Sequence, residues 1–335
     1  MKKFLALALA LAMSASMLAG CANNSASNSS APSSGTPSSS APSGEGGGST
    51  IQIAKEDLKV GLVLPGSIND QGWSTSAYLG LQAIEEDYGC ETTYMENVTV
   101  ASYEESFRSL ASAGYNVIFG HGSEFFDAAE IVGAEFPDVA FIVTSTDRFA
   151  APNVASVNTL PTEMGYIGGV GAALATNPDI KVLTNMTGDD FDAAKCKEVA
   201  QAMIDQGADV IFYDADAAGL GALEACQENG VMAIPAIADA SELAPDTVLM
   251  SACNAIGQAM DTVVGYIVDG TFTGQFYPMG CDTGCVYYTT NDPVWNANMT
   301  EENQAKVEEV YQQLVNKEID VDAAIASVPA EITVS

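Results

Sequence analysis

The alternation of short β-branched runs with amphipathic segments, which begins at residue 58, constrains the fold of this sequence more than any other feature. Residues 59–64 (KVGLVL) are typical of a buried strand, and residues 74–88 place Ala77, Leu81 and Ile84 on one face of a helix. Strands separated by single helices pair in parallel, because each helical crossover returns the chain to the same end of the sheet. The pattern therefore predicts an α/β fold of doubly wound parallel sheets with helices on both faces.

Two series of these units follow one another along the chain. The first continues with expected strands and helices at residues 90–95, 103–113, 116–119, 125–135 and 139–144. The second starts with an expected helix at 166–175 and continues at 180–183, 193–204, 210–213, 220–228, 231–234, 248–250, 255–268, 285–288 and 301–315. Two series indicate two lobes joined by a hinge, with a ligand at the carboxyl ends of the strands.

The expected lobes are each discontinuous in sequence. We assign residues 58–155 plus about 246–275 to the N-terminal lobe, and residues 156–245 plus about 276–318 to the C-terminal lobe. Residues 319–335 are expected to form a tail. With 335 residues, 47% of them hydrophobic, the chain is long enough for two cores.

The charge balance excludes one class of partner. The formal net charge is −33, and such a surface repels the phosphate backbone of a nucleic acid instead of binding it. An anionic ligand is disfavoured for the same reason. A small neutral ligand is the class that this balance favours.

The first residues are typical of a bacterial lipoprotein signal peptide. Lys2 and Lys3 precede an apolar stretch at 4–18 that is short for a membrane span. Residues 18–21 (LAGC) then resemble a lipoprotein cleavage site, at which the Cys21 thiol receives a diacylglyceryl group. We therefore expect residues 1–20 to be removed and the protein to be anchored by lipid at the extracytoplasmic face of the cell membrane.

Residues 21–57 are predicted to form a lipidated, disordered tether. From 22 to 50 nearly every residue is Ser, Gly, Pro, Ala, Asn or Thr, which buries too little apolar area to offset the entropy of ordering. A coil of this composition reaches roughly 30 Å. The folded body would then stand clear of the lipid surface.

Several motifs resemble, in order and spacing, the basic membrane protein family of lipoproteins, the purine-nucleoside-binding subunits of bacterial ABC importers. Residues 66–80 (GSINDQGWSTSAYLG) look like the first strand-to-helix loop of that family, in which an acidic pair precedes an aromatic residue that stacks on the base. Further matches are 120–128 (GHGSEFFDA), 136–141 (FPDVAF), 152–154 (PNV), 163–166 (EMGY), 205–212 (DQGADVIF), 219–221 (GLG) and 243–248 (LAPDTV). The resemblance covers residues 58–317.

The resemblance implies a solute-binding lipoprotein of the periplasmic-binding-protein type I fold, which closes on a purine nucleoside and delivers it to ABC permease and ATPase subunits. It implies a binding function, not an enzymatic one. Two alternatives stay open: a sugar-binding protein of the same fold, and a receptor lipoprotein that reports ligand occupancy without transport.

The chain departs from the family pattern at several positions. Ser145 stands where the family usually has an Asp, although Asp147 follows two residues later, and only Asp239 remains of a family Asp-x-Asp. A family Lys near the last strand is replaced, around Asp282, by a short CDTGC segment. Residues 176–179 are too few for a parallel crossover, so either the second sheet lacks a strand or the helix that ends at 175 feeds a different one, and the second lobe is expected to be shortened.

The candidate ligand-binding residues lie mostly in loops at the ends of strands. Trp73 is expected to stack on a base, although a buried staple of the following helix is the alternative. Asn69 and Asp70 suit either ligand hydrogen bonds or helix capping, and Asp214 and Asp216 have the same two interpretations. The full set is Asn69, Asp70, Trp73, Ser74, Gly122, Phe125, Ser145, Asp147, Glu163, Asp214, Asp216, Gly219 and Asp239.

We predict no catalytic residue, no metal site and no cofactor. His121 is the single histidine, and no nucleophile-elbow motif surrounds it, so packing at the end of a strand is its favoured role. Residues 214–224 start like a calcium loop, but they lack its ligand spacing. The six cysteines after Cys21 form no Cys-x-x-Cys pair, and most of them fall on segments predicted to be buried.

Overall fold

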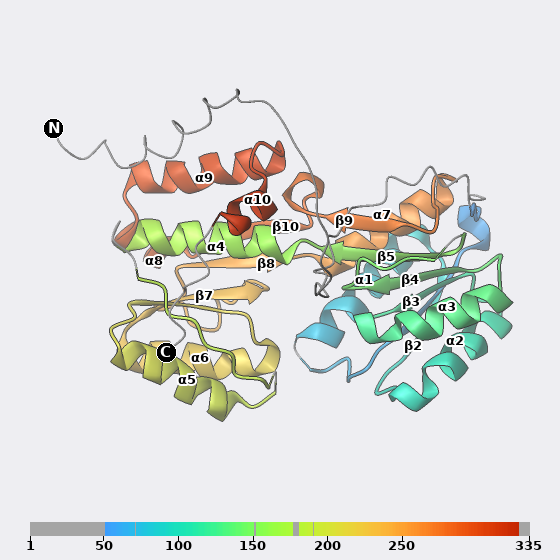
Figure 1. Cartoon of the computed structure of the whole chain (residues 1–335), viewed down its shortest axis with the longest axis horizontal. Coiled ribbons are helices and arrows are strands. Elements are labelled where there is room, and N and C mark those ends of the chain that lie inside the picture. Colours follow the sequence, from blue (N-terminus) through green and yellow to red (C-terminus); the bar gives the residue numbers. More distant parts are fainter. Residues whose placement is uncertain (1–50, 71, 151, 177–180, 190, 328–335) are drawn as a thin grey trace, which may run out of the picture. The chain divides into compact units, whose positions relative to one another are not determined.

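The computed structural model describes residues 51–327 with the exception of residues 71, 151, 177–180 and 190. The predicted signal peptide, the Cys21 lipid site and residues 21–50 of the predicted tether lie outside the described residues. The prediction of a disordered tether is wrong for residues 51–57, because Ile51 pairs with Phe272 and Ile53 is buried in the first core. The strands found in each predicted series pair within one sheet (Figure 1). The helix predicted at 255–268 belongs to the second series, but it packs on the first sheet.

The first sheet has six strands in the order β2-β1-β3-β4-β5-β9, and all neighbours are parallel. Its strands are β1 (Lys59–Val63), β2 (Glu91–Met95), β3 (Val117–Gly120), β4 (Ala140–Thr144), β5 (Val154–Thr159) and β9 (Phe276–Met279). Because β1, β3 and β4 are buried on both faces, their sequences are almost continuous apolar runs.

Helices cover both faces of this sheet. Helices α1 (Trp73–Tyr88) and α7 (Ile256–Val268) share one hydrophobic core with it, and α2 (Tyr103–Ser112) and α3 (Phe126–Glu135) share another. Short 3₁₀ turns precede several elements. In the described residues they are Lys55–Asp57, Val100–Ser102, Ser123–Phe125, Asp216–Ala218 and Cys281–Thr283.

Two glycines allow α1 and α7 to pack closely. A methyl group on Gly257 would lie 2.8 Å from the Cα of Gly80, and a methyl group on Gly80 would meet the backbone of Gly257 in the same way. Only residues without a side chain fit at this crossing. The close contact holds α1, and with it the start of α1 at Trp73, against the sheet.

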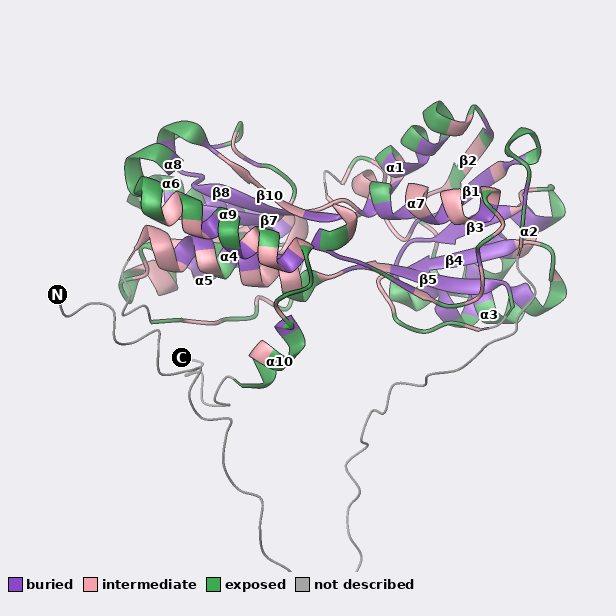
Figure 2. Cartoon of the chain, turned by 90° about the horizontal axis from the view of Figure 1, so that it is seen from above, coloured by how far each residue is buried: buried purple, intermediate pink, exposed green. Residues whose placement is uncertain are grey.

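The second sheet has four strands in the order β10-β8-β7-β6, with only β10 antiparallel to its neighbour. Its strands are β6 (Val210–Tyr213), β7 (Met232–Ile237), β8 (Met250–Asn254) and β10 (Val286–Thr290). One core joins it to α4 (Pro161–Ala175), α8 (Asp292–Asn298), α9 (Glu301–Val315) and α10 (Val321–Ala326). Strand β8 is buried except for its last residue and β7 is buried in its middle (Figure 2), whereas β6 and β10 are mostly half-buried.

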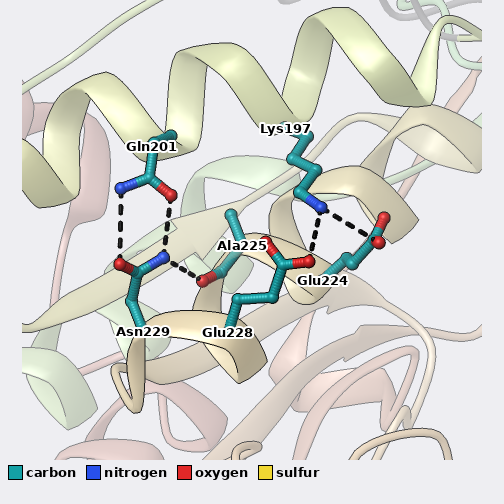
Figure 3. A network of polar contacts seen from close by, with 6 residues as sticks. All are labelled: Lys197, Gln201, Glu224, Ala225, Glu228 and Asn229. Atoms are coloured by element: carbon teal, nitrogen blue, oxygen red, sulfur yellow. Dashed lines mark hydrogen bonds and ion pairs between the residues drawn. The ribbon is translucent and has the colours of Figure 1, made fainter.

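Helices α5 (Ala193–Asp205) and α6 (Gly219–Asn229) pack on β6 and β7 through a further core. Polar contacts also join the two helices at their surface (Figure 3). The Lys197 ammonium lies 2.8 Å from a Glu228 carboxylate oxygen and 3.0 Å from one of Glu224. The amides of Gln201 and Asn229 donate to one another. Exposed pairs of this kind contribute little stability, so the apolar core holds the helices together.

The strand predicted at 180–183 is wrong for the residues that the structure describes, because Lys181 to Leu183 have no regular secondary structure. A strand persists only where a neighbour pairs with its backbone N–H and C=O groups. Within the described residues, the second sheet ends at β6, and this run does not pair with it. The expected shortening of the second lobe therefore appears as a sheet of four strands beside one of six.

The chain passes between the sheets at places other than the expected boundaries. Strand β8 begins at Met250 and pairs in the second sheet, although residues from 246 were expected in the first lobe. Strand β9 pairs with β5 in the first sheet, although residues from 276 were expected in the second. The expected tail contains α10, whose Val321 is buried in the second core.

No helix among the described residues is long and apolar enough to cross a membrane.

Candidate ligand-binding site

Three strands of the first sheet end at one place and bring Trp73, His121 and Thr144 together. Trp73 is the first residue of α1, which follows β1, whereas His121 directly follows β3 and Thr144 ends β4. The Trp73 and His121 rings are stacked, with centroids 4.1 Å apart and an interplanar angle of 25°. We call these two rings the aromatic platform.

His121 is fully buried, and both of its ring nitrogens have partners. Nε2 lies 3.0 Å from the Trp73 carbonyl oxygen, and Nδ1 lies 2.9 Å from Thr144 Oγ1. Because a carbonyl only accepts, Nε2 carries the proton and Nδ1 accepts from the Thr144 hydroxyl. The same hydroxyl accepts from the Gly122 N–H at 3.0 Å, so the network is complete for a neutral imidazole.

The burial of His121 also sets its protonation. Removal from water lowers the pKa of His121 to about 4, although the hydrogen bond to Trp73 and the Asp70 charge act in the opposite direction. The imidazole is therefore neutral at neutral pH. Packing at the end of a strand, the role favoured from the sequence, is what the structure gives this residue.

Asp70 caps α1, which is the second of its two expected roles. Its carboxylate accepts from the backbone N–H groups of Gly72, Ser74 and Thr75 at 2.8–3.0 Å, and from the Thr75 hydroxyl at 2.9 Å. Burial alone would raise the pKa of Asp70, but these hydrogen bonds lower it overall. The cap fixes where α1 begins and therefore where Trp73 stands.

The neighbours of Asp70 differ in exposure. Asn69 is exposed, whereas Ser74 is 1% exposed. Ser74 Oγ is a buried hydroxyl that has no hydrogen-bond partner among the described residues. Gly66 packs against it, since a methyl group there would lie 2.9 Å from Ser74 Oγ.

A loop of the second sheet reaches the same place. Asp216 follows β6, is half-buried and has a positive φ of 42°. A methyl group on Gly72 would lie 3.2 Å from its Oδ1, so the Asp216 carboxylate stands beside the backbone that leads into Trp73. Asp214 is exposed in the same loop, and Gly219 begins α6 against the Tyr213 ring. The structure therefore brings together Asp70, Trp73, Ser74, Gly122 and Asp216.

Other candidates lie apart from this group or have structural partners. Phe125 is buried in the core and contacts the rings of Tyr103 and Phe107. Ser145 has a positive φ of 60°, and its N–H donates to the Val157 carbonyl. Asp147 is exposed.

Two acidic candidates stabilise backbone turns in the second half of the chain. Glu163 Oε2 accepts from the Cys281 N–H at 2.6 Å, which ties the start of α4 to the turn after β9. Asp239 Oδ1 accepts from the Ser241 N–H at 2.9 Å and lies 3.4 Å from Ser251 Oγ. Burial alone would raise the pKa of Asp239, but its hydrogen bonds lower it overall.

Thr144 is a member of the site that the sequence reasoning missed. Its hydroxyl links His121 to the Gly122 backbone, yet a threonine at the end of a strand is ordinary in sequence. The signal that was available is the position of Thr144 in the sheet. Thr144 is the last residue of β4, and β4 lies next to β3, which the single histidine directly follows.

The described residues contain no group of three or more His, Cys, Asp or Glu side chains that gather as metal ligands. Their six cysteines are all buried and free. Burial raises the pKa of Cys226 and of Cys253 to about 12, which disfavours the reactive thiolate.

A surface hollow of about 520 Å³ lies elsewhere, at the amino ends of β1 and β2, where Lys55, Lys59 and Tyr88 are among its lining residues. Its two lysines are already engaged: Lys59 pairs with Glu91 at 2.7 Å, and Lys55 donates to the Asp87 carbonyl. The aromatic platform at the carboxyl ends is the stronger candidate, because ligand sites of such sheets lie there.

The sequence profile of one family matches both parts of the chain. The family is described as ABC transporter substrate-binding protein PnrA-like (Bmp), and it matches residues 57–176 and 173–324. The chain therefore belongs to the Bmp family of ABC transporter substrate-binding proteins, whose role is to bind solutes and not to catalyse a reaction. The resemblance seen in the sequence is confirmed, and the two matched segments overlap at residues 173–176, where the short connection of 176–179 begins.

Individual relatives are similar over most of the chain. A protein of Bacillus subtilis named transcriptional activator protein med is 28% identical over 264 residues, which cover 70% of this chain and 83% of that protein. A purine-binding protein of Brucella abortus is 28% identical over 289 residues, which cover 76% of this chain and 82% of that protein. The structure of an ABC transporter solute-binding protein from Aeropyrum pernix has a TM-score of 0.68 at 18% identity, covering 80% of this chain and 96% of that one. The predicted type I fold is confirmed.

Proposed function

We propose that this protein binds a purine nucleoside at the aromatic platform and delivers it to the permease and ATPase subunits of an ABC importer. The observation that carries the proposal is the position of Trp73, a half-buried indole at the carboxyl ends of the strands with one face on His121. A planar ligand can then stack only on the opposite face. Purines suit this face, because base stacking on an aromatic side chain is worth about 1–3 kcal/mol.

Acidic groups near the platform suit the sugar of a nucleoside. The carboxylates of Asp216 and Asp214 belong to the loop that approaches Gly72, and carboxylates accept hydrogen bonds from hydroxyl groups. Asn69 is exposed beside the capped start of α1 and offers an amide. The relative named purine-binding protein supports the purine.

The net charge of −33 favours a nucleoside over a nucleotide, because a phosphate would meet a field of like charge. We propose further that Cys21 anchors the protein by lipid at the extracytoplasmic face of the cell membrane. A lipid anchor would keep the binding protein close to its transporter.

A thermal-shift comparison of the full-length protein in detergent tests the ligand. Inosine, guanosine and adenosine at about a hundred times their Kd should add about 2.7 kcal/mol of stability, or roughly 5–10 °C in Tm. Free ribose and inosine 5′-monophosphate should give little shift. A larger shift with a sugar than with any nucleoside would favour the sugar-binding alternative and reject the proposal.

Signal reception is a second candidate, favoured by the relative named transcriptional activator protein. The two candidates share the ligand and differ in its fate. Uptake of radiolabelled inosine by cells, with and without the gene, separates them: transport requires that uptake falls in the deletion strain, whereas a receptor leaves it unchanged.

A further inference from the structure

We propose that His121 is a positioning residue for ligand binding: the buried imidazole fixes the plane of the Trp73 indole on which the base stacks. The identity of the ligand rests on the proposed function. The restraint of Trp73 by His121 concerns this chain alone. The imidazole contacts Trp73 twice, through the stacked ring at 4.1 Å and through Nε2 at 3.0 Å from the Trp73 carbonyl.

The two contacts restrain different parts of Trp73. The Nε2–H donates to its backbone carbonyl, which also accepts from the Ser76 hydroxyl at 2.6 Å, so the backbone at the start of α1 is held from two sides. The stacked ring restrains the side chain and limits rotation of the indole. A half-buried tryptophan at the first position of a helix otherwise has several rotamers, and ordering one of them would reduce affinity.

His121 can impose this restraint because it is itself fixed. It is fully buried, and its Nδ1 accepts from Thr144, a residue with no exposed surface at the end of β4. The Thr144 hydroxyl in turn holds the Gly122 N–H. The plane of the indole is therefore set by strands β3 and β4, and not only by its own loop.

A purely structural role for His121 is the competing explanation, and Asn153 supplies the matched control. Asn153 is 3% exposed in the same lobe, directly before β5, and its Nδ2 donates to the carbonyls of Gly133, Phe136 and Val139. These partners all lie away from the platform residues. Asn153→Ala therefore removes a buried polar network of the first sheet without contact to Trp73.

The experiment uses the full-length protein in a Trp295→Phe background, in which Trp73 is the remaining tryptophan. His121→Ala, Thr144→Val and Asn153→Ala are compared by Tm, by acrylamide quenching of Trp73 without ligand, and by the Kd for inosine. All three should lower Tm. His121→Ala should weaken inosine binding about tenfold or more and increase quenching about twofold, Thr144→Val should shift both in the same direction by less, and Asn153→Ala should change neither.

If His121→Ala fails to fold, Thr144→Val decides the question, because it replaces one hydroxyl by a methyl group and keeps the ring. Quenching and inosine affinity equal to those of Asn153→Ala, at a similar loss of Tm, would refute the positioning role while leaving the nucleoside function intact. If the unmutated protein binds neither inosine nor other nucleosides, that result would reject the proposed function instead. In that case the quenching measured without ligand still supports or refutes the positioning of Trp73.

Discussion

Trp73 is the residue on which the proposed site depends. Its indole has one face on His121, so truncation to Ala removes the surface on which a base would stack. Base stacking is worth about 1–3 kcal/mol, and Trp73→Ala should therefore weaken nucleoside binding by about ten- to a hundredfold. Trp73→Phe keeps an aromatic face and should lose much less. Isothermal titration of each variant with inosine measures the difference, and an unchanged Kd for Trp73→Ala would place the base elsewhere.

His121 makes folding sensitive to acid in a defined pH range. Its pKa is about 4 in the folded protein and about 6.5 when exposed, so between these values the unfolded chain binds more protons. Stability should be unaffected by His121 above pH 6.5 and should fall as the pH drops toward 4. The loss from this residue amounts to about 3 kcal/mol at the lower end.

Urea unfolding at pH 7, 6, 5 and 4 tests this expectation. The same titration with His121→Gln, which has no group that titrates in the range, retains the acid sensitivity of Asp70 and the other carboxylates. The difference between the two pH profiles isolates His121. Parallel profiles from pH 7 to pH 4 would mean that the pKa of His121 is the same in the folded and the unfolded protein, contrary to the expectation.

At the scale of elements, the cap of α1 links stability to binding. Asp70→Ala removes the acceptor for three backbone N–H groups at the start of the helix, and we expect a loss of about 1–2 kcal/mol in the free energy of unfolding. Because α1 begins at Trp73, the same change should weaken inosine binding.

Asp192→Ala is the matched control, since Asp192 caps α5 by accepting from the Lys195 N–H at 3.0 Å. It should lower stability without altering inosine affinity or the fluorescence of Trp73. Equal effects of the two substitutions on affinity would show that binding responds to general destabilisation and not to the position of Trp73.

Elements with strong local patterns could be predicted from the sequence, and those that depend on the order of strands could not. The helix expected at 74–88 matches α1 within one residue, because its apolar spacing is regular. Strand β5 was missed because its sequence, VASVNT, mixes polar with apolar residues. Strand β9 contains Pro278, which is tolerated because β9 lies at the edge of the sheet, and the edge is visible only in the folded topology.

The same limit applies to the site. The loop with Asp70 and Trp73 could be identified from its motif, but the contact between Trp73 and His121 joins residues 48 positions apart. Neither a stacking angle nor the hydrogen bond to Thr144 leaves a periodic signal in the sequence. Phe125 was predicted as a ligand-binding residue because it belongs to the 120–128 motif. In the structure its ring lies in the core, a position that depends on the pairing of β3 with β4.

At the scale of the whole molecule, the net charge bears on the proposed lipid anchor. The net charge of −33 opposes close contact with anionic lipid headgroups, so charge alone would not hold the protein near a membrane and the proposed anchor would have to do so. A diacylglyceryl group supplies two acyl chains, whereas a single chain binds only reversibly. The site of that anchor is proposed to be Cys21, which lies outside the described residues.

Cys21→Ala should therefore leave the body folded and release it from the membrane, because Cys21 is the only expected lipid site and the residues after it are expected to be a flexible tether. Cell fractionation followed by immunoblotting measures the distribution, and inosine binding by the released protein confirms that it is folded. Cys90→Ala is the control, since Cys90 packs in the first core and its loss should cost some stability without affecting retention. If Cys21→Ala stays in the membrane fraction after a high-salt wash, lipid at Cys21 is not what holds the protein there.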